Sequence, residues 1–324
     1  MKETIAKILL ERNIAENKHL FMTPLVTVII PAYRRKNYLF YALDRVLAQK
    51  DVTMEILVFS EVMEPDEVDK VAEVYPQVQY FKMDEYQGAS NKRRAGIKKA
   101  QGKYLYMPDD DDYLIDDCFF KKAVEILEND ETLSLVAGNT VISHEYADKS
   151  KNYKEYRELS LEGKINGLDY LQGLQVTKNK PISSVSIMFR KQAFLDRDVD
   201  AMYEISDVPM YMNALLWGDA FIIPETSAVY RFHEKNLTYN LSFPFIYNVV
   251  REKERVYRNA KMQLLNPDEF WYHHFRISYF FYKDGNATIF GKMKLLCWGI
   301  THLHRNKKLF RLIIKEFVKC FVKR

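Results

Sequence analysis

The stretch Lys103-Tyr104-Leu105-Tyr106-Met107-Pro108-Asp109-Asp110-Asp111-Asp112-Tyr113-Leu114 places a short apolar strand directly before four consecutive carboxylates. Four like charges this close repel one another, so the run is unfavourable unless a cation or a solvated turn absorbs the charge. A solvated loop that caps the next helix is one interpretation. A ligand site is the other, because α/β sheets bind ligands beyond the carboxyl ends of their strands. Carboxylate oxygens there would suit Mg²⁺ or Mn²⁺.

Strands and helices alternate on the N-terminal side of this stretch. Val26–Tyr33 is a continuous apolar run typical of a strand buried on both faces, and Pro31 is expected to end it. The other expected strands are 54–59, 78–83 and 104–107, and the helices between them are 37–49, 65–74 and 88–100. This rhythm predicts parallel pairing, and therefore an α/β fold with a mostly parallel sheet flanked by helices. Neither G-x-G-x-x-G nor G-x-x-x-x-G-K-[ST] occurs in the chain.

Composition is that of a globular protein. The chain has 324 residues, 48% hydrophobic and 28% charged, enough for one large domain with an appendage or for two domains. Its three cysteines, Cys118, Cys297 and Cys320, have no metal-binding or disulfide spacing, which indicates a reducing compartment. Charges interrupt the N-terminal region, so no signal peptide is expected, and no apolar run reaches the roughly 18 residues of a membrane-spanning helix. We therefore expect a cytoplasmic protein.

Both ends of the chain are predicted to be helical additions. Residues 2–18 have the pattern of an amphipathic helix, and we place the divisions of the chain at 1–22, 23–236 and 237–324. Residues 291–324 contain ten Lys and Arg against one Glu, whereas the whole chain has a formal net charge of +4. The C-terminal region is therefore basic and the rest of the chain mildly acidic.

The last predicted helix, 307–322, is expected to carry its apolar residues on one face and most of its Lys and Arg elsewhere. These apolar residues are Phe310, Ile313, Ile314, Phe317 and Phe321. A basic amphipathic helix suits an anionic membrane surface, which predicts a peripheral protein on the cytoplasmic face of the membrane. Packing on its own domain or on a second subunit of a homo-oligomer is the alternative. No nucleic-acid-binding motif accompanies the charge, and no nucleic-acid partner is expected.

Over residues 24 to about 236 the sequence resembles glycosyltransferase family 2, which are inverting enzymes with the GT-A fold. The matching features in chain order are Val28–Tyr33, Gln49, Gln87–Ser90 with Arg93 and Gly96, Asp109–Leu114, Ser206–Asp207, Trp217–Gly218, Ile223–Glu225 and Tyr230–His233. The resemblance implies a Rossmann-like GT-A domain that transfers a sugar from a nucleotide sugar, with a UDP-sugar preferred. The implied acceptor is a glycan or a lipid-linked oligosaccharide in surface polysaccharide synthesis.

By this resemblance the acidic run is the D-x-D motif of the family. Asp111 and His233 are implied ligands of a divalent metal ion, Mn²⁺ or Mg²⁺, and Asp109 contacts the ribose or the metal. Asp110 occupies the variable middle position of the nucleotide-sugar site. Asp112 is either a structural residue or a support for the ligands. For His233 the alternative is a packed side chain without a ligand.

Asp207 is the implied general base, at the start of a helix predicted over 208–217. Inversion requires one carboxylate that takes the proton of the acceptor hydroxyl. Ser206 stands where the family has Glu, and Glu204 is a nearby carboxylate that is out of register. The structural alternative for Asp207 is a helix N-cap.

The remaining donor contacts are implied by the first two strands and the third helix. Pro31, Ala32 and Tyr33 are expected near the base, and Arg93 near the diphosphate or a base edge. The alternative for Arg93 is a solvated side chain. Glu61 stands where the family has an Asp that reads uracil, one methylene longer. Two other classes remain open: a sugar-phosphate nucleotidyltransferase on a related fold, and a non-catalytic carbohydrate-binding relative.

Overall fold

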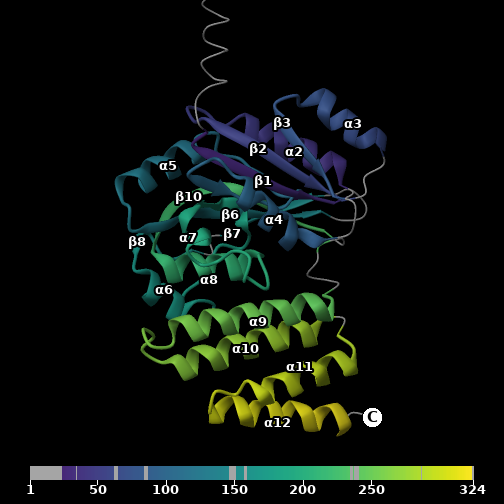
Figure 1. The fold of residues 1–324 in the computed structure, drawn as a ribbon, viewed down its shortest axis with the longest axis vertical. Coiled ribbons are helices and arrows are strands. Elements are labelled where there is room, and N and C mark those ends of the chain that lie inside the picture. Colours follow the sequence, from purple (N-terminus) through teal and green to yellow (C-terminus); the bar gives the residue numbers. More distant parts are fainter. Residues whose placement is uncertain are drawn as a thin grey trace, which may run out of the picture.

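A computed structural model describes residues 24–33, 35–61, 65–83, 87–145, 151–156, 159–233, 236, 241–285 and 287–322. The helix predicted at 2–18 and the predicted division 1–22 lie outside these residues. In the described part of the chain, a sheet flanked by helices forms one half of the molecule, and the helices of the C-terminal region stack against it as further layers (Figure 1).

The N-terminal half of the sheet is built from alternating strands and helices. Its elements are β1 (Val26–Ala32), α2 (Lys36–Leu47), β2 (Met54–Ser60), α3 (Pro65–Val74), β3 (Val78–Lys82), α4 (Gly88–Lys99) and β4 (Tyr104–Tyr106). They follow the predicted order, with bounds that differ by at most two residues. The rhythm of apolar runs was sufficient here because the strands are short and β1, β2 and β4 are largely buried, although β3 is buried only at Val78.

The second half is less regular. Its elements are β5 (Tyr113–Leu114), α5 (Phe119–Asn129), β6 (Leu133–Glu145), β7 (Lys151–Tyr156), β8 (Gly163–Ile165), α6 (Gly167–Gly173), the 3-10 turn η1 (Ser184–Ser186), β9 (Ile187–Arg190), α7 (Gln192–Leu195), α8 (Asp207–Trp217) and β10 (Asp219–Phe232). The C-terminal helices are α9 (Phe243–Ala260), α10 (Pro267–Asp284), α11 (Ile289–Thr301) and α12 (Lys307–Val322). The predicted α/β class with a helical C-terminal region is confirmed.

One mixed sheet runs through the molecule in the order β3-β2-β1-β4-β9-β6-β10-β5, with β7 paired to β6 and β8 paired to β10. Strands β3, β2, β1 and β4 are parallel, and so are β6 and β10. Strand β9 joins these two groups by antiparallel pairing with β4 and β6. The carboxyl ends of β1 and β4 therefore lie at the same edge of the sheet, where the acidic run begins.

Pro31 lies within β1 and does not end it, so this part of the prediction is wrong. Strand β4 pairs only with Val26–Val28, which leaves the last part of β1 without a ladder on that side. A proline is tolerated beside an open edge, because its missing N–H then costs no ladder hydrogen bond. Across this opening the Tyr33 N–H donates to Asp110 Oδ2 at 2.7 Å. The turn of the acidic run thus takes the place of the missing ladder.

Gly96 allows α4 to lie directly on β1. A Cβ atom at this position would be 2.4 Å from Ile29 Cγ2, a distance that packed side chains do not reach. A larger residue would push the helix away from the sheet. Lys92 and Arg93, one turn earlier in α4, are both buried at the sheet edge. Their positions depend on this close approach.

The hydrophobic core continues from the sheet into the C-terminal helices. A single cluster of buried side chains contains Leu135 of β6, Leu215 of α8, Val250 of α9, Trp271 of α10, Leu295 of α11 and Ile313 of α12. The helical region is therefore packed on the sheet and its helices. None of the described helices is both long enough and apolar enough to cross a membrane.

The prediction of a single apolar face on α12 is wrong. Leu309 and Ile313 are fully buried in the core, whereas Phe310, Ile314 and Phe321 are exposed. The helix consequently has an inward apolar face, by which it packs on its own domain, and an outward apolar face. A hydrophobic pattern read from sequence merges two such faces when they are adjacent on the helix.

A buried carboxylate of α9, Glu252, connects α9 to α8. Glu252 is fully buried, forms an ion pair with Arg255 at 2.7 Å, and accepts a hydrogen bond from Asn213 Nδ2 of α8 at 2.8 Å. Its second oxygen accepts the Tyr203 N–H at 2.7 Å. Glu252 thereby fixes α8, and the segment just before it, against the helical region.

We expect Glu252→Ala to destabilise the protein by about 3–5 kcal/mol, because the substitution leaves the Arg255 charge and the Asn213 amide without their buried partner. The loss is measured as the shift of the urea unfolding midpoint. Lys98→Ala is the control: its ion pair with Asp200 is exposed on both sides, so little change is expected. Equal losses in the two variants would contradict the role given to Glu252.

Candidate active site

The acidic run lies between β4 and β5 and is largely enclosed by protein. Carboxylate oxygens of Asp109, Asp111 and Asp112 approach to within 4.8 Å of one another, and Asp110, Asp111 and Asp112 are buried. Buried like charges are unfavourable unless cations or hydrogen-bond donors surround them. The interpretation of the run as a solvated loop is therefore excluded, and the neighbouring residues show how the charge is compensated.

Arg35, between β1 and α2, supplies positive charge to two of the carboxylates. It forms an ion pair with Asp110 Oδ1 at 2.7 Å and another with Asp111 Oδ2. Burial raises the pKa of Asp110 to about 7, although Arg35 opposes this rise. Burial would also raise the pKa of Asp111, but the contact with His233 and the charge of Arg35 outweigh it and lower the pKa. Asp111 is therefore held in its carboxylate form.

His233 follows β10 directly and faces the acidic run. Its Nε2 atom lies 3.1 Å from Asp111 Oδ2, and its ring stacks on Tyr38 of α2 at 5.4 Å between centroids. Asp111 is thus next to the predicted ligand His233, and its carboxylate lies within 4.8 Å of that of the predicted ligand Asp109. Carboxylates with an imidazole beside them are ligands that suit a divalent cation such as Mn²⁺.

Asp112 is committed to contacts within the protein. Its Oδ2 accepts the Ser183 hydroxyl at 2.6 Å, and its Oδ1 accepts the Arg231 N–H at 2.9 Å. Burial, with the charges of Asp111 and Asp109 adding to it, raises the pKa of Asp112 well above its usual value. Asp112 therefore fastens the acidic run to β10 and to the segment before η1, which is the structural one of the two roles considered for it.

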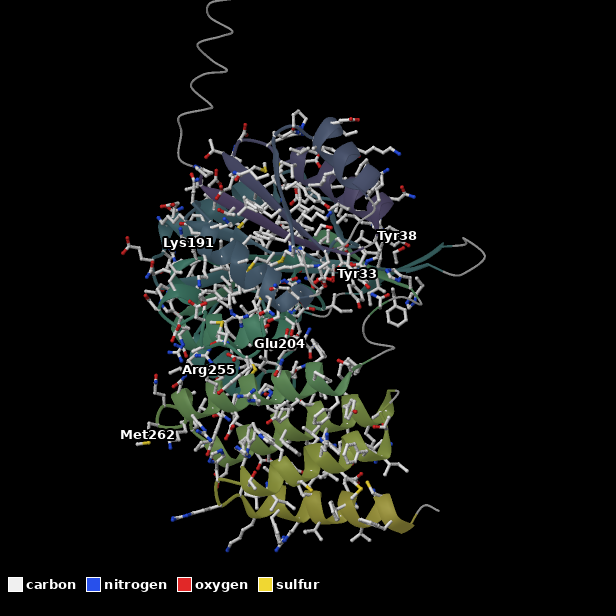
Figure 2. The ribbon with its side chains drawn as sticks, turned by 45° about the vertical axis from the view of Figure 1, so that its right-hand side comes forward. Tyr33, Tyr38, Lys191, Glu204, Arg255 and Met262 are labelled. Carbon is white, nitrogen blue, oxygen red and sulfur yellow. The ribbon has the colours of Figure 1, made fainter. Side chains whose placement is uncertain are left out.

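The predicted nucleotide contacts gather at the ends of β1 and β2. Lys92 Nζ donates to the Ala32 carbonyl at 2.8 Å, lies 3.2 Å from Glu61 Oε1, and is 5.8 Å from the centre of the Tyr33 ring. Tyr33 is 40% exposed at this edge, where Figure 2 labels it near Tyr38. Ala32, Tyr33 and Glu61, which are predicted to lie near the base, are therefore close to one another, and Pro31 precedes them in β1. The Tyr33 N–H connects them to Asp110. Contact of Asp110 with a nucleotide sugar stays a prediction.

Glu61 has a structural role that the sequence did not indicate. Its Oε1 atom accepts the N–H groups of Gln87 and Gly88 at 2.8 and 2.7 Å, at the N-terminus of α4. Its Oε2 atom is buried and has no hydrogen-bond partner among the described residues. One oxygen thus positions α4, and the other is the atom for which a ligand N–H is predicted.

Arg93 joins the acidic run to the segment that precedes α8. It donates to Asp109 Oδ1 at 2.7 Å and to the Ile205 carbonyl at 3.1 Å. Burial raises the pKa of Asp109; Arg93 opposes this, and the charge of Asp207 adds to it. The predicted phosphate contact, a predicted metal ligand and the predicted base are therefore neighbours.

Asp207 is the first residue of α8, and its side chain does not cap the helix. Its Oδ1 atom accepts the Ser184 N–H at 3.3 Å, while Ser206 is at the N-cap position without a capping bond from its hydroxyl. The N-cap alternative for Asp207 is thus not what the structure shows. Glu204 is buried, and burial raises its pKa to about 7 although Arg93 opposes the rise.

Arg35 and Arg231 were not predicted to belong to the site. Arg231 donates to the Asp111 carbonyl at 2.8 Å and packs over the Tyr113 and Tyr38 rings, at 4.3 and 4.8 Å from their centres. Arg231 lies within the motif Tyr230–His233, whereas Arg35 lies two residues after the motif Val28–Tyr33. The only signal in the sequence was the need of four carboxylates for nearby cations.

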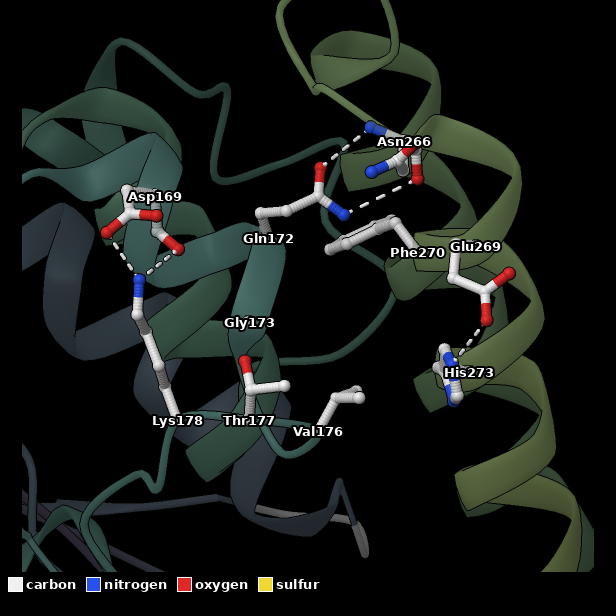
Figure 3. A pocket seen from close by; sticks show the side chains of 10 residues that line it. All are labelled: Asp169, Gln172, Gly173, Val176, Thr177, Lys178, Asn266, Glu269, Phe270 and His273. Atoms are coloured by element: carbon white, nitrogen blue, oxygen red, sulfur yellow. Dashed lines mark hydrogen bonds and ion pairs between the residues drawn. The ribbon is translucent and has the colours of Figure 1, made fainter.

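A cavity of about 220 Å³ lies away from this site, between α6 and α10 (Figure 3). Its lining includes an ion pair between Lys178 and Asp169 and hydrogen bonds between Gln172 and Asn266. None of the predicted site residues lines it. The chemistry indicated by the sequence is therefore located at the sheet edge and not in this cavity.

Comparison with known proteins identifies the family. A family model described as glycosyl transferase family 2 matches residues 27–197, more than half of the chain. The chain belongs to glycosyltransferase family 2. The resemblance drawn from its motifs is thereby confirmed, and the matched range includes the acidic run.

The matching relatives are distant in sequence. An uncharacterized glycosyltransferase of Rickettsia felis is 29% identical over 165 residues, which cover 50% of this chain and 25% of the relative. The chondroitin synthase of Pasteurella multocida is 29% identical over 124 residues, which cover 37% of this chain and 13% of the relative. The match to the Rickettsia relative thus spans about a quarter of that protein's length.

The fold is similar to that of solved structures of TarS. Residues 1–349 of TarS from S. aureus, in complex with UDP-GlcNAc, superpose with a TM-score of 0.62 at 13% identity, and the match covers 84% of this chain and 80% of that one. At this identity the likeness establishes the fold alone. The predicted GT-A fold is confirmed, whereas the role of each site residue stays a prediction.

The buried Glu204 gives the protein a specific pH dependence. Because its folded-state pKa of about 7 exceeds its ordinary value of 4.5, the stabilisation from its bound proton is fully present below about pH 4.5 and is lost as the pH rises through about 7. The free energy of unfolding of Glu204→Gln should therefore rise relative to that of wild type by up to about 3 kcal/mol when the pH is raised from 5 to 8. Urea unfolding at both pH values measures this. If the free energies of unfolding of the variant and of wild type change with pH in parallel, the raised pKa of Glu204 is contradicted.

Proposed function

We propose that the protein is an inverting, metal-dependent glycosyltransferase that takes a sugar from a UDP-sugar. The observation that carries this proposal is the gathering of Asp109, Asp111, His233 and Asp207 at one sheet edge of a family 2 fold. The TarS structures of similar fold contain UDP-GlcNAc and UDP, which supports a uridine nucleotide as the donor.

The acceptor we propose is a glycan or a lipid-linked oligosaccharide in surface polysaccharide synthesis. Chondroitin synthase and hyaluronan synthase, both of Pasteurella multocida, are among the matching relatives. Both are named for polymers of sugars. The matched residues cover only 13% and 14% of these relatives, so they support the class of acceptor and not its identity.

Donor binding is assigned to the residues at the ends of β1 and β2. Tyr33 is exposed enough to stack on the base, and the second oxygen of Glu61 is the acceptor for a base N–H. Arg93 lies beside Asp109 and is the proposed contact of the diphosphate. A divalent ion held by Asp109, Asp111 and His233 would stabilise the negative charge that develops on the leaving diphosphate.

Asp207 is the proposed general base. Its carboxylate would accept the proton of the acceptor hydroxyl while that oxygen attacks the anomeric carbon on the face opposite the leaving diphosphate. A single displacement of this kind inverts the configuration. Ser184 orients the carboxylate through its backbone N–H, which leaves Oδ2 for the acceptor.

We expect Asp207→Asn to lower sugar transfer by about two to four orders of magnitude while UDP affinity is retained, because the amide keeps the size of the side chain and cannot accept the proton. The assay measures UDP released from a panel of UDP-sugars with Mn²⁺ and oligosaccharide acceptors, and UDP affinity is measured separately by calorimetry. Glu204→Gln is the matched control and should retain transfer.

Near wild-type transfer by Asp207→Asn would contradict its role as base, and loss of transfer in Glu204→Gln alone would assign the base to Glu204. The wild-type assay also separates the other two classes. A nucleotidyltransferase would form pyrophosphate from a nucleoside triphosphate and a sugar phosphate. A carbohydrate-binding relative would release no nucleotide from any UDP-sugar.

A further inference from the structure

The outward face of α12 presents a continuous row of large apolar side chains. Phe310, Ile314, Val318 and Phe321 follow one another at helical spacing and are 47%, 43%, 51% and 59% exposed. They are distinct from Leu309 and Ile313, which are buried in the core beneath them. The helix is therefore fixed to the protein by one face while the other faces outward.

Helix α11, which packs against α12, also carries exposed apolar residues. Ile289, Phe290 and Ile300 are exposed, and α11 and α12 are consecutive helices at the end of the molecule farthest from β3 (Figure 1). Scattered exposed apolar residues are ordinary, but a group of seven on two adjoining helices is the kind of surface that binds a partner. We call these seven residues, together with Lys307, Arg311 and Lys315 of α12, the α11–α12 surface.

A row of cations lies beside the apolar residues on α12. Lys307, Arg311 and Lys315 recur every four residues, are exposed, and form no ion pair with the residues that the structure describes. By contrast, Lys308 and Lys319 are paired with Glu269 and Glu316. The region 291–324 has ten Lys and Arg and one Glu, so the surroundings add further positive charge.

We propose that the α11–α12 surface docks the protein on an anionic lipid bilayer, with α12 lying in the plane of the interface. The apolar row would enter the boundary between headgroups and acyl chains, and Lys307, Arg311 and Lys315 would lie at the lipid phosphates. A second copy of the chain fits this surface less well, because a symmetric pairing brings an identical basic row against the first. The inference goes beyond the proposed function and does not depend on it.

The test is sedimentation of the full-length protein with vesicles of phosphatidylcholine alone or with added phosphatidylserine. We expect binding to the anionic vesicles at low salt and release at high salt, because salt at about 0.1 M screens charge beyond about 10 Å. The triple variant Lys307→Gln, Arg311→Gln, Lys315→Gln should partition about a hundredfold more weakly, since each cation near such a surface contributes a factor of about five.

Two further variants test whether vesicle binding depends on where the cations lie and on the apolar row. Lys50→Gln, Lys70→Gln, Lys82→Gln removes the same charge from exposed sites elsewhere and should bind as wild type does. The pair Ile314→Ser, Val318→Ser should also lose binding, with an unchanged unfolding midpoint because both side chains are exposed.

Absence of binding to anionic vesicles, or equal loss in the two triple variants, would overturn the proposal. A dimer in light scattering that the Ile314→Ser, Val318→Ser variant dissociates, without any vesicle binding, would assign the surface to a second copy. Either failure leaves the proposed enzyme unaffected, because no site residue lies beyond His233.

Discussion

The burial of three of the four consecutive aspartates, Asp110, Asp111 and Asp112, is the constraint on which the rest of the structure depends. Such a cluster is unfavourable without compensating charges and hydrogen-bonding partners, and these come from distant parts of the chain. Arg35 follows β1, Arg93 belongs to α4, and His233 follows β10. Each brings its own element to the end of β4. The same contacts place the predicted metal ligands, the predicted phosphate contact and the predicted base beside one another, so the electrostatic requirement and the proposed chemistry are met by one arrangement.

The supporting structure keeps this arrangement in place from both sides. Close packing at Gly96 sets the position of α4 on the sheet, and Asp112 ties the acidic turn to β10. On the other side, the buried Glu252 holds α8, whose first residue is Asp207, against α9. The helical region therefore contributes to the site although it supplies none of its predicted residues.

The sequence predicted the strands and helices, which depend on neighbouring residues, and missed the contacts between residues far apart in the chain. Alternating strands and helices were recognisable because each has its own hydrophobic period, and the acidic run stood out by composition. Arg35 and Arg231 could not be assigned, since they meet Asp111 across 76 and 120 residues of sequence. Pro31 was misjudged because the length of β4 decides whether its N–H is needed. The two faces of α12 were merged because periodicity does not tell which apolar side faces the core.

The most direct test of the account is the dependence of UDP binding on metal, measured by titration calorimetry with Mn²⁺ and with a chelator. If Asp109, Asp111 and His233 hold a divalent ion against the diphosphate, chelation should weaken UDP binding by more than about tenfold. The Asp111→Ala variant should bind UDP weakly with or without Mn²⁺, whereas Asp112→Asn should retain the metal dependence if folded, because both oxygens of Asp112 are committed to protein contacts. Equal UDP affinity of the wild-type protein with and without metal would contradict the central claim.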